Sequence, residues 1–525
     1  MLNKIINNKI LILFFIPFFL GLLSTFSFQP YNYVIINFLI LPTLFFILTY
    51  VNKRSKNVYR KKPYFKNLFY IGYFFGVGYF LSNTYWISYA LTFDENFKFL
   101  IPFSLIFIPL FLALFFGLAT LFVGPFLKNN FPSILIFCAS LSFLDFLRSK
   151  LFTGFPWNLW PYSLTTFPEF LQLTNKIGFF AFNLIIITMF CLPILIFFKN
   201  KKINFSILAV SFSLLLCNYF YGSIIINKYS TNNKSNYQKK LKEMNLKIIS
   251  PNFDLKYNLN SDDVPQLIKK LIRYSDPNDS KETIFLWPEG VFTGYEFGDI
   301  YKFRSLIKNS FSKNHKIVFG INRYEKNLDS FFNSLIIINN DFDILYQYNK
   351  KKLVPFGEFL PFENILNKFG FKKITYGYGS FLKGSEQNNY EFDGISILPL
   401  ICYEIIFPEL IQKSNINTNL IINISEDAWF RNSVGPYQHF SKAIFRAIES
   451  DTIVARSANK GFSAIINSKG QILKSLKPTE TGNIEMNINI NKSENKNRND
   501  LIFFLLLFTY TIIFFTLRNK LNDKK

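Results

Sequence analysis

The chain has 525 residues, half of them hydrophobic and 19% aromatic, and it carries 58 Lys and Arg residues against 34 Asp and Glu residues. The formal net charge of +24 does not indicate nucleic-acid binding, because no basic stripe interleaved with aromatic residues stands out between the apolar segments. With two histidines and four cysteines, three of which lie in apolar runs, the composition argues against a transition-metal site. We expect neither a metal nor another cofactor.

Eight apolar runs are long enough, at roughly 20 residues, to cross about 30 Å of hydrocarbon. They lie at 10–27, 33–51, 67–90, 100–122, 131–147, 177–198, 203–226 and 501–517. The sequence therefore predicts a multi-pass α-helical membrane domain with eight transmembrane helices. We place seven of these helices in a domain at 1–227, and the last helix with a cytoplasmic tail at 496–525.

Positive charge gathers in alternate connections between these runs, and cytoplasmic loops are the ones that retain Lys and Arg. The loops at 53–66 and 199–202 and the tail at 518–525 are rich in Lys and Arg, whereas the loop at 28–32 carries no charge. We therefore expect both termini in the cytoplasm. The segment between the seventh and eighth runs is then expected on the outer side of the membrane.

The segment 228–495 contains no long apolar run and is predicted to be a separate, water-soluble domain. Its predicted strands lie at 246–249, 283–287, 316–320, 333–338, 344–348, 395–402 and 419–424. Amphipathic helices lie between some of these strands, and hairpins are mixed in. This combination favours a layered α/β sandwich over a purely parallel Rossmann sheet.

Cys402 is the one cysteine outside the long apolar runs, and it ends a predicted strand in the sequence Leu400-Ile401-Cys402-Tyr403-Glu404. A thiol at a strand end is a candidate nucleophile. On this observation alone, a buried packing cysteine remains the alternative.

Histidine bases are scarce. His315 is expected in a solvated turn before a strand, and His439 begins a predicted amphipathic helix. Without a histidine, a carboxylate must take the thiol proton, and a cation or backbone N–H groups must stabilise the oxyanion. Glu289 and Lys350 follow two further predicted strands, and strand ends of one sheet can meet at one edge. A nearby lysine would favour the thiolate, although a solvated position in the run Lys350-Lys351-Lys352 is the alternative for Lys350.

Three motifs in order resemble the nitrilase superfamily, in the form of its membrane-embedded apolipoprotein N-acyltransferase branch. They are Leu286-Trp287-Pro288-Glu289-Gly290, Tyr348-Asn349-Lys350 leading into Leu353-Val354-Pro355-Phe356-Gly357-Glu358, and Cys402-Tyr403-Glu404. Further segments extend the resemblance over most of the chain: Tyr85-Trp86-Ile87, Thr153-Gly154-Phe155-Pro156-Trp157, Asp427-Ala428-Trp429-Phe430 and Gly435-Pro436-Tyr437-Gln438-His439.

The resemblance implies an α-β-β-α sandwich and a transfer of an acyl group in two steps. Cys402 would be the nucleophile that forms a thioester, Glu289 the general base and acid, and Lys350 the group that stabilises the oxyanion. Supporting roles around lysine, nucleophile and substrate would fall to Glu358, Tyr403 and Glu404. Candidate substrate contacts are Tyr257, Trp157, Trp429 and His439.

The implied acyl donor is a membrane phospholipid, and the implied acceptor is an apolipoprotein whose N-terminal cysteine carries a diacylglyceryl group. The protein is expected as a monomer in a bacterial inner membrane, with the soluble domain on the periplasmic side. The chain departs from the family pattern at Ser250-Pro251-Asn252, at Tyr257, where Trp is usual, and at Glu426, where Asn is more frequent.

Three other functions stay open on the sequence alone. A membrane-tethered amidase or nitrilase would use water in its second step. A transporter with an outer binding domain should carry charges within its spans, where Asp145 is the main one found. A catalytically inactive homologue should have lost one of Glu289, Lys350 and Cys402, all of which are present.

Overall fold

The computed structural model describes residues 8–58, 63–235, 240–255, 259–366, 368, 380–385, 389–412, 418–491 and 500–522. The chain divides into two compact units. Residues 1–227 and 498–525 form a helical unit, and residues 228–497 form a second unit, called here the sandwich unit. Tyr257, a predicted substrate contact, lies outside the described residues.

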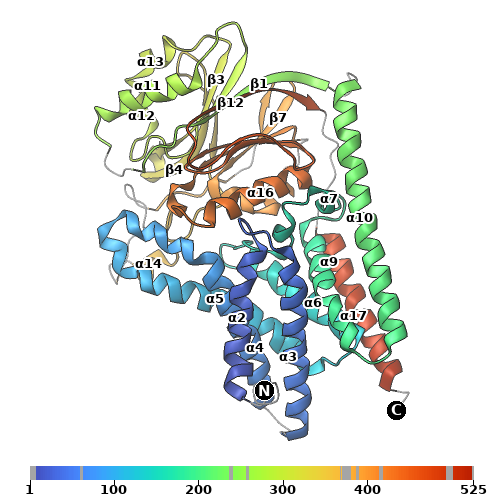
Figure 1. The fold of residues 1–525 in the computed structure, drawn as a ribbon. Helices are drawn as coiled ribbons and strands as arrows, with labels where there is room; N and C mark the ends of the chain where they lie inside the picture. The colour runs from blue at the N-terminus through green and yellow to red at the C-terminus, as the bar shows by residue number, and fades with distance from the viewer. Residues whose placement is uncertain are drawn as a thin grey trace. The chain divides into compact units, whose positions relative to one another are not determined.

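The helical unit consists of long apolar helices joined by short helical segments (Figure 1). The long helices are α3 (Asn37–Val58), α4 (Pro63–Thr84), α5 (Ile101–Val123), α6 (Phe131–Lys150), α9 (Phe179–Cys191), α10 (Lys201–Ser235) and α17 (Leu501–Asn522). The short segments are η1 (Leu11–Phe15), α2 (Ile16–Leu23), η2 (Ser24–Ser27), η3 (Val34–Ile36), η4 (Tyr85–Phe93), η5 (Glu95–Leu100), η6 (Gly124–Phe126), η7 (Trp160–Leu164), α7 (Pro168–Leu171), α8 (Thr174–Ile177) and η8 (Leu192–Phe197).

Six helical stretches in the described part of the chain are long and apolar enough to cross a membrane. They are Val34–Arg54, Glu95–Phe126, Phe131–Lys150, Phe179–Phe197, Lys201–Tyr229 and Leu501–Arg518. The predicted run at 10–27 coincides with the shorter apolar helix Leu11–Ser27, and the predicted run at 67–90 falls on α4 and η4. The predicted multi-pass helical region is confirmed, and the count of eight stays a prediction.

Glycines allow the helices of this unit to pack closely. An added Cβ on Gly78 of α4 would lie 2.0 Å from the carbonyl oxygen of Phe18 in α2. An added Cβ on Gly76 would lie 2.8 Å from the Cα of Ala113 in α5. Small residues that permit such close approach are a common basis for helix association in a bilayer.

The sandwich unit contains two six-stranded sheets. The first has the strand order β12-β1-β2-β3-β4-β5, and the second has the order β11-β10-β9-β8-β7-β6. Strands of the first sheet are β1 (Lys240–Ser250), β2 (Thr283–Leu286), β3 (His315–Glu325), β4 (Ser330–Ile338), β5 (Ile344–Asn349) and β12 (Gly482–Asn491). Strands of the second are β6 (Tyr390–Phe392), β7 (Ile395–Ile401), β8 (Leu420–Glu426), β9 (Ile453–Asn459), β10 (Ser463–Ile466) and β11 (Ile472–Leu476).

The two sheets face each other across one apolar core. Ile248, Leu286 and Val318 of the first sheet pack in the same cluster as Ile397 and Ile422 of the second. These side chains alternate along each strand with side chains of the opposite face, as the two-residue period of a strand requires.

Helices cover the outer face of each sheet (Figure 1). On the first sheet, Ile268 and Leu271 of α11 (Asp263–Ser275) pack with Phe285 and Ile317. The short helices α12 (Phe297–Tyr301) and α13 (Arg304–Lys308) continue this layer, while α16 (Gly435–Ser450) packs on β9 and β10 of the second sheet. Two further short helices are α14 (Glu363–Leu366) and α15 (Pro408–Gln412). The predicted α-β-β-α sandwich is confirmed.

Candidate active site

Strand direction brings the predicted site residues to one edge of the sandwich. β2 and β3 are parallel, and β4 is antiparallel to both β3 and β5, so β5 runs in the same direction as β2. Glu289 follows β2, and Lys350 follows β5, so both side chains leave the first sheet at the same edge. Cys402 follows β7 of the facing sheet.

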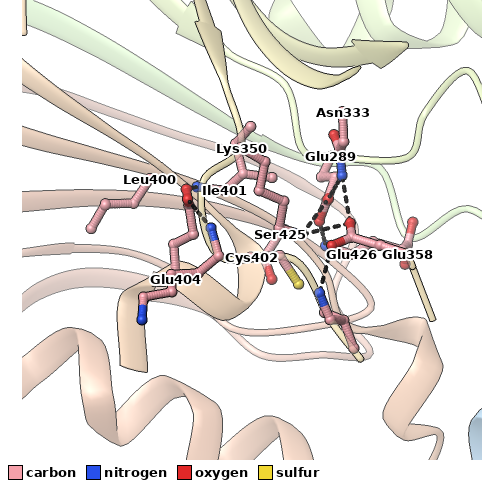
Figure 2. Close-up of polar contacts among 12 residues, drawn as sticks. Glu289, Asn333, Lys350, Glu358, Leu400, Ile401, Cys402, Glu404, Ser425 and Glu426 are labelled. Atoms are coloured by element: carbon pink, nitrogen blue, oxygen red, sulfur yellow. Dashed lines mark hydrogen bonds and ion pairs between the residues drawn. The ribbon is translucent and has the colours of Figure 1, made fainter. Parts of the chain in front are cut away.

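Glu289, Asn333, Lys350 and Glu358 form a buried group, called here the carboxylate–lysine cluster (Figure 2). The Lys350 ammonium donates to Glu358 Oε1 at 2.8 Å and to Glu289 Oε1 at 3.4 Å. Asn333 Nδ2 donates to the same two oxygens, at 2.7 Å and 2.8 Å respectively. The two carboxylates therefore share one cation and one amide donor.

Backbone donors hold the two carboxylates from the other side. Glu426 N donates to Glu289 Oε2 at 3.1 Å, and Val354 N donates to Glu358 Oε2 at 2.9 Å. The backbone of Lys350 also donates to Asn333 O at 2.9 Å, which continues the pairing of β4 with β5 beyond the strand end. Each carboxylate is thus held by a backbone N–H group of its own in addition to the two donors that they share.

Cys402 lies in a turn that few residues other than glycine adopt. Its φ is +48°, and it is the first residue of η12 (Cys402–Ile406), directly after the fully buried strand β7. Figure 2 shows its sulfur beside Lys350 and Ser425, facing the carboxylate–lysine cluster. Only 8% of the residue is exposed. The structure therefore brings together Glu289, Lys350 and Cys402.

Glu404 joins the turn at Cys402 to the residues after Lys350. Its Oε1 accepts from Tyr348 Oη at 2.9 Å, from Lys351 N at 2.7 Å and from Lys352 N at 3.1 Å, while its Oε2 accepts from Ile401 N at 2.8 Å. A single buried carboxylate therefore sets the spacing between β5 and β7. Tyr403 is partly buried and packs edge-on against Phe407, with ring centroids 5.0 Å apart.

Burial and charge determine the protonation states at this edge. Burial lowers the pKa of Lys350, but Glu289 and Glu358 raise it by more, so the side chain is a cation with a pKa above its ordinary value. Burial, followed by Glu289, raises the pKa of Cys402 well above its ordinary value, and Lys350 offsets only part of this increase. Lys350 thus favours the thiolate, as expected, but burial has the larger effect and the side chain rests as a thiol. The thiol needs a base during attack.

A second buried group, the histidine cluster, lies behind the nucleophile and consists of Asn423, Ser425, Asp427, His439 and Arg456. His439 Nδ1 lies 3.0 Å from Asp427 Oδ1, and His439 Nε2 lies 3.2 Å from the carbonyl oxygen of Cys402. Arg456 Nη2 donates to Asp427 Oδ2 at 2.8 Å. His439 is fully buried, and both ring nitrogens contact protein groups; its predicted contact with substrate stays a prediction.

The histidine cluster contains a paired charge. Burial raises the pKa of Asp427, but Arg456 and His439 lower it by more, so this pKa lies below its ordinary value. Burial also lowers the pKa of His439, and Arg456 adds to this against the opposing effect of Asp427.

The other predicted substrate contacts lie in different places. Trp429 is partly buried in η13 (Asp427–Phe430), two residues after Asp427. Trp157 belongs to the helical unit, where its buried ring lies 4.7 Å from that of Trp86 and its carbonyl oxygen accepts from Arg148 Nη1 at 3.1 Å.

Comparisons with known proteins agree with this architecture. Residues 20–192 match the apolipoprotein N-acyltransferase N-terminal domain, and residues 259–496 match the carbon-nitrogen hydrolase domain. An apolipoprotein N-acyltransferase of Rickettsia prowazekii is 30% identical over 474 residues, which are 89% of this chain and 90% of the relative. The corresponding protein of Rhodopseudomonas palustris is 31% identical over 408 residues, 75% of each chain. The chain belongs to the apolipoprotein N-acyltransferase family.

Membership in the apolipoprotein N-acyltransferase family confirms the resemblance inferred from the three motifs. The carbon-nitrogen hydrolase match includes the whole carboxylate–lysine cluster and Cys402. A solved CN-hydrolase superfamily protein of Xanthomonas campestris is also similar, with 17% identity and a TM-score of 0.34 over 47% of this chain and 91% of that chain. In the described part of the chain, no group of three His, Cys, Asp or Glu side chains is arranged to hold a metal ion.

The family motifs include Asp427 and His439, but they do not include Asn333 or the other members of the histidine cluster, which are Asn423, Ser425 and Arg456. Asn333 faces the sandwich interior with Leu335 and Ile337, which alternate with it along β4. A polar residue on the inward side of an apolar strand is the signal that could have identified it. Arg456 lies in the middle of β9, where a buried charge among apolar strand residues is a similar signal.

Proposed function

We propose that the chain transfers a fatty acyl group from a membrane phospholipid to the α-amino group of the N-terminal diacylglyceryl-cysteine of an apolipoprotein. The acyl group is carried as a thioester on Cys402. Family membership supports the acyltransferase activity. One observation carries the mechanism. At the buried edge of the sandwich, Lys350 Nζ lies 3.4 Å from Glu289 Oε1, and Cys402 lies beside them in a left-handed backbone conformation.

In the first half of the reaction, Cys402 Sγ attacks the ester carbonyl carbon of the phospholipid while Glu289 takes the thiol proton. The carbonyl oxygen becomes an oxyanion beside the Lys350 ammonium, which stabilises the charge. Collapse of the tetrahedral intermediate breaks the ester C–O bond, and Glu289 returns the proton to the leaving alkoxide. The products are a lysophospholipid and the acylated cysteine.

In the second half, the free α-amine of the acceptor attacks the thioester carbonyl carbon. Glu289 takes a proton from the attacking nitrogen, and Lys350 again faces the oxyanion. Collapse breaks the C–S bond, and the departing Cys402 sulfur recovers the proton from Glu289. A thioester is activated enough to acylate an amine, so the reaction needs no external energy source.

The resting protonation states support this division of roles. Cys402 has a raised pKa, so it rests as a thiol whose proton must be removed as the C–S bond forms. Lys350 has a raised pKa, so it remains a cation and cannot be the base at neutral pH. Glu289 and Glu358 both contact this cation, and Glu289 is the one of the two that raises the pKa of the thiol, which favours Glu289 as the base.

Both proposed substrates carry acyl chains that insert into a bilayer, which supports a location in the bacterial cytoplasmic membrane. The charge pattern of the loops supports a periplasmic sandwich unit and cytoplasmic termini. We further propose that one copy of the chain performs both halves of the reaction. Labelling of Lys281→Cys in intact cells tests the orientation, since Lys281 is an exposed side chain of the sandwich unit. A membrane-impermeant maleimide should label this variant without lysis of the cytoplasmic membrane.

The thioester is tested with purified full-length protein and a phospholipid that carries a labelled acyl chain. We expect label on the protein that neutral hydroxylamine removes, and we expect none on Cys402→Ala. The matched control is Cys217→Ala, which removes an exposed cysteine of α10 and should retain the label. Absence of label on a folded wild-type protein would contradict the mechanism.

The acceptor is tested by a chase of the labelled protein. Addition of a diacylglyceryl-modified lipopeptide with a free α-amine should move the label to the peptide. The same peptide with an acetylated amine should leave the label on the protein. Release of the label as free fatty acid at the same rate with or without the peptide would instead favour a hydrolase.

A further inference from the structure

The contact between His439 and the backbone of Cys402 joins two segments that are far apart in the sequence. His439 lies in the first turns of α16, whereas Cys402 begins η12 after β7. The ring Nε2 lies 3.2 Å from the Cys402 carbonyl oxygen, and the histidine is fully buried. The reaction steps proposed above use the thiol, Glu289 and Lys350, and they leave this contact without a role.

The partner of Nε2 fixes where the ring carries a proton. A carbonyl oxygen can only accept a hydrogen bond, so Nε2 must carry hydrogen to make this contact favourable. Asp427 Oδ1 at Nδ1 is also an acceptor, and the imidazolium donates to both acceptors. In the neutral ring protonated at Nε2, Nδ1 accepts from Arg456 Nη2, 3.1 Å away, and Nε2–H still donates to Cys402. We assign these two states to His439, and in both of them the Cys402 carbonyl receives a hydrogen bond.

The rest of the histidine cluster prevents the ring from turning away. Asp427 Oδ1 lies 3.0 Å and Arg456 Nη2 lies 3.1 Å from His439 Nδ1. Ser425 Oγ donates to Asp427 Oδ1 at 2.6 Å, and the ring of Phe430 lies edge-on to the imidazole at 5.4 Å. The donor is thus held in one orientation before any substrate arrives.

The same cluster also holds the backbone on the other side of the nucleophile. Asn423 Nδ2 donates to the carbonyl oxygen of Leu400 at 3.0 Å, and Arg456 Nη1 in turn donates to Asn423 Oδ1. The carbonyl groups of Leu400 and Cys402 are therefore both fixed by one buried network. Between them the chain changes from strand β7 to the left-handed conformation of Cys402, which side-chain-bearing residues rarely adopt.

We propose that His439 is a positioning residue whose Nε2–H holds the Cys402 carbonyl and, through it, the left-handed turn that directs the thiol at the carboxylate–lysine cluster. The inference rests on the proposed role of Cys402 as nucleophile. His439 transfers no proton in this proposal. Its contribution is orientation, to which attack rates are sensitive: a displacement of about 1 Å costs about 10²-fold in rate.

Two substitutions of His439 separate the Nε2 donor from the rest of the ring. The amide nitrogen of Gln reaches the position of the imidazole Nε2, whereas the amide of Asn reaches only the position of Nδ1. We expect His439→Asn to slow single-turnover formation of the acyl-enzyme by about 10²-fold, at an unchanged half-saturating phospholipid concentration. We expect His439→Gln to recover most of this loss. His439→Met, which fills the site without a donor, replaces His439→Asn if the latter does not fold.

The chain offers a matched control in its only other histidine. His315 is also fully buried, and its Nε2 lies 3.0 Å from a carbonyl oxygen, that of Asn278, but on the other face of the first sheet. His315→Asn should lower the unfolding temperature without slowing acyl-enzyme formation per folded molecule. Slower acyl-enzyme formation in His439→Asn, together with a normal rate in His315→Asn, supports the positioning role of His439.

The outcomes distinguish this inference from the proposed function. An unchanged acylation rate in folded His439→Asn, or an equal loss in His439→Gln, would overturn the positioning role and leave the thioester mechanism intact. Acyl label that persists on Cys402→Ala would overturn the thioester mechanism itself.

Discussion

Two buried charged clusters flank Cys402, and they differ in how completely their charges are paired. In the carboxylate–lysine cluster, Glu289 and Glu358 share one ammonium, so a negative charge remains in excess. In the histidine cluster, Asp427 pairs with Arg456, and the ring of His439 completes the group. The first arrangement retains a carboxylate that can accept a proton, whereas the second has its charges matched.

The two clusters also differ in access to solvent. The side chains of Glu289 and Glu358 are 10% and 9% exposed, whereas those of Asp427 and Arg456 are 0% exposed. The side chains of the first cluster bond to one another and accept from backbone N–H groups, at the edge that faces the thiol. Those of the second cluster bond to one another and donate to two backbone carbonyl oxygens. We propose the reaction for the more accessible cluster and a supporting role for the fully buried one.

Removal of the single cation should have the largest effect on the first cluster. Lys350→Met leaves two carboxylates buried together without their shared ammonium and removes the group that faces the oxyanion. We expect acyl-enzyme formation to fall by about 10³-fold and the free energy of unfolding to fall by about 3–5 kcal/mol. Single-turnover acylation and thermal unfolding in detergent measure the two effects.

Lys352→Met is the control for this substitution. Lys352 belongs to the same run of lysines, but its side chain is 26% exposed and pairs with Glu409 at 2.8 Å. Its removal should change acylation by less than about threefold, since a partly exposed ion pair contributes little. Equal losses in Lys350→Met and Lys352→Met would contradict a special role for the buried lysine.

Glu289→Gln should have opposite effects on acyl transfer and on the reactivity of the Cys402 thiol. The substitution removes the base, so acyl transfer should fall by about 10²- to 10⁴-fold. It also removes a negative charge that raises the pKa of Cys402, so more thiolate should be present at any given pH. Alkylation of Cys402 by iodoacetamide at pH 8 should therefore become faster in the variant that transfers acyl groups more slowly.

The control is the variant of the second carboxylate. Glu358 shares donors with Glu289, but Glu289 is the carboxylate with a direct effect on the thiol pKa. Glu358→Gln should slow acyl transfer less and should leave alkylation closer to wild type. A reversed order would show that Glu358 is the base.

Local sequence predicts the first cluster much better than the second. Glu289, Lys350 and Cys402 each lie one to three residues after a strand, and strand ends can be recognised from apolar runs and the residues that break them. The role of His439 depends on how α16 packs against a turn that lies far away in sequence. No local pattern specifies such a contact, and the substrate contact that the family resemblance implies for this histidine gives no indication of it.

The pKa of Cys402 escapes prediction from the sequence for a related reason. The neighbouring lysine can be identified in the sequence, but burial of the thiol requires β7, β8 and the first sheet to be in place. Burial then outweighs Lys350. The sign of the pKa shift thus depends on tertiary packing, which composition and spacing do not give.

Asp427→Asn should affect stability more than it affects chemistry. The pKa of Asp427 is lower in the folded state, so its stabilisation is present above the unfolded value of about 3.9 and is lost as the pH falls toward the folded pKa. At pH 7 we expect the free energy of unfolding of the variant to be about 3 kcal/mol lower than that of the wild type, because Arg456 would remain charged and buried without its partner. We would measure the unfolding temperatures of the variant and the wild type from pH 7 to pH 3. The difference between these two temperatures should become smaller as the pH falls. A constant difference would indicate that the Asp427 charge does not stabilise the fold.

Glu426 lies between the two clusters, and its substitution should have the smallest effect. Its backbone N–H donates to Glu289, while its carboxyl accepts from Asn459 Nδ2 at 2.9 Å and from Ala428 N at 3.0 Å. Burial raises its pKa well above the ordinary value, and Asn459 offsets only part of this. The folded state therefore favours the protonated carboxyl, and stability falls as the pH rises from the unfolded value of about 4.3 through the folded pKa.

Glu426→Gln replaces this carboxyl with a neutral group of the same shape. The variant should therefore not lose stability as the pH rises. We expect acylation within about threefold of wild type, since the backbone donor to Glu289 is retained. The unfolding temperature of the variant, relative to wild type, should rise from pH 5 to pH 8 by about 2–4 °C, which corresponds to about 1 kcal/mol for a unit of this size. A relative unfolding temperature that falls over this range would mean that the charged carboxylate is the form the fold prefers. Glu426 would then belong with Glu289 and Glu358 as a third buried carboxylate, and the excess negative charge would extend beyond the carboxylate–lysine cluster.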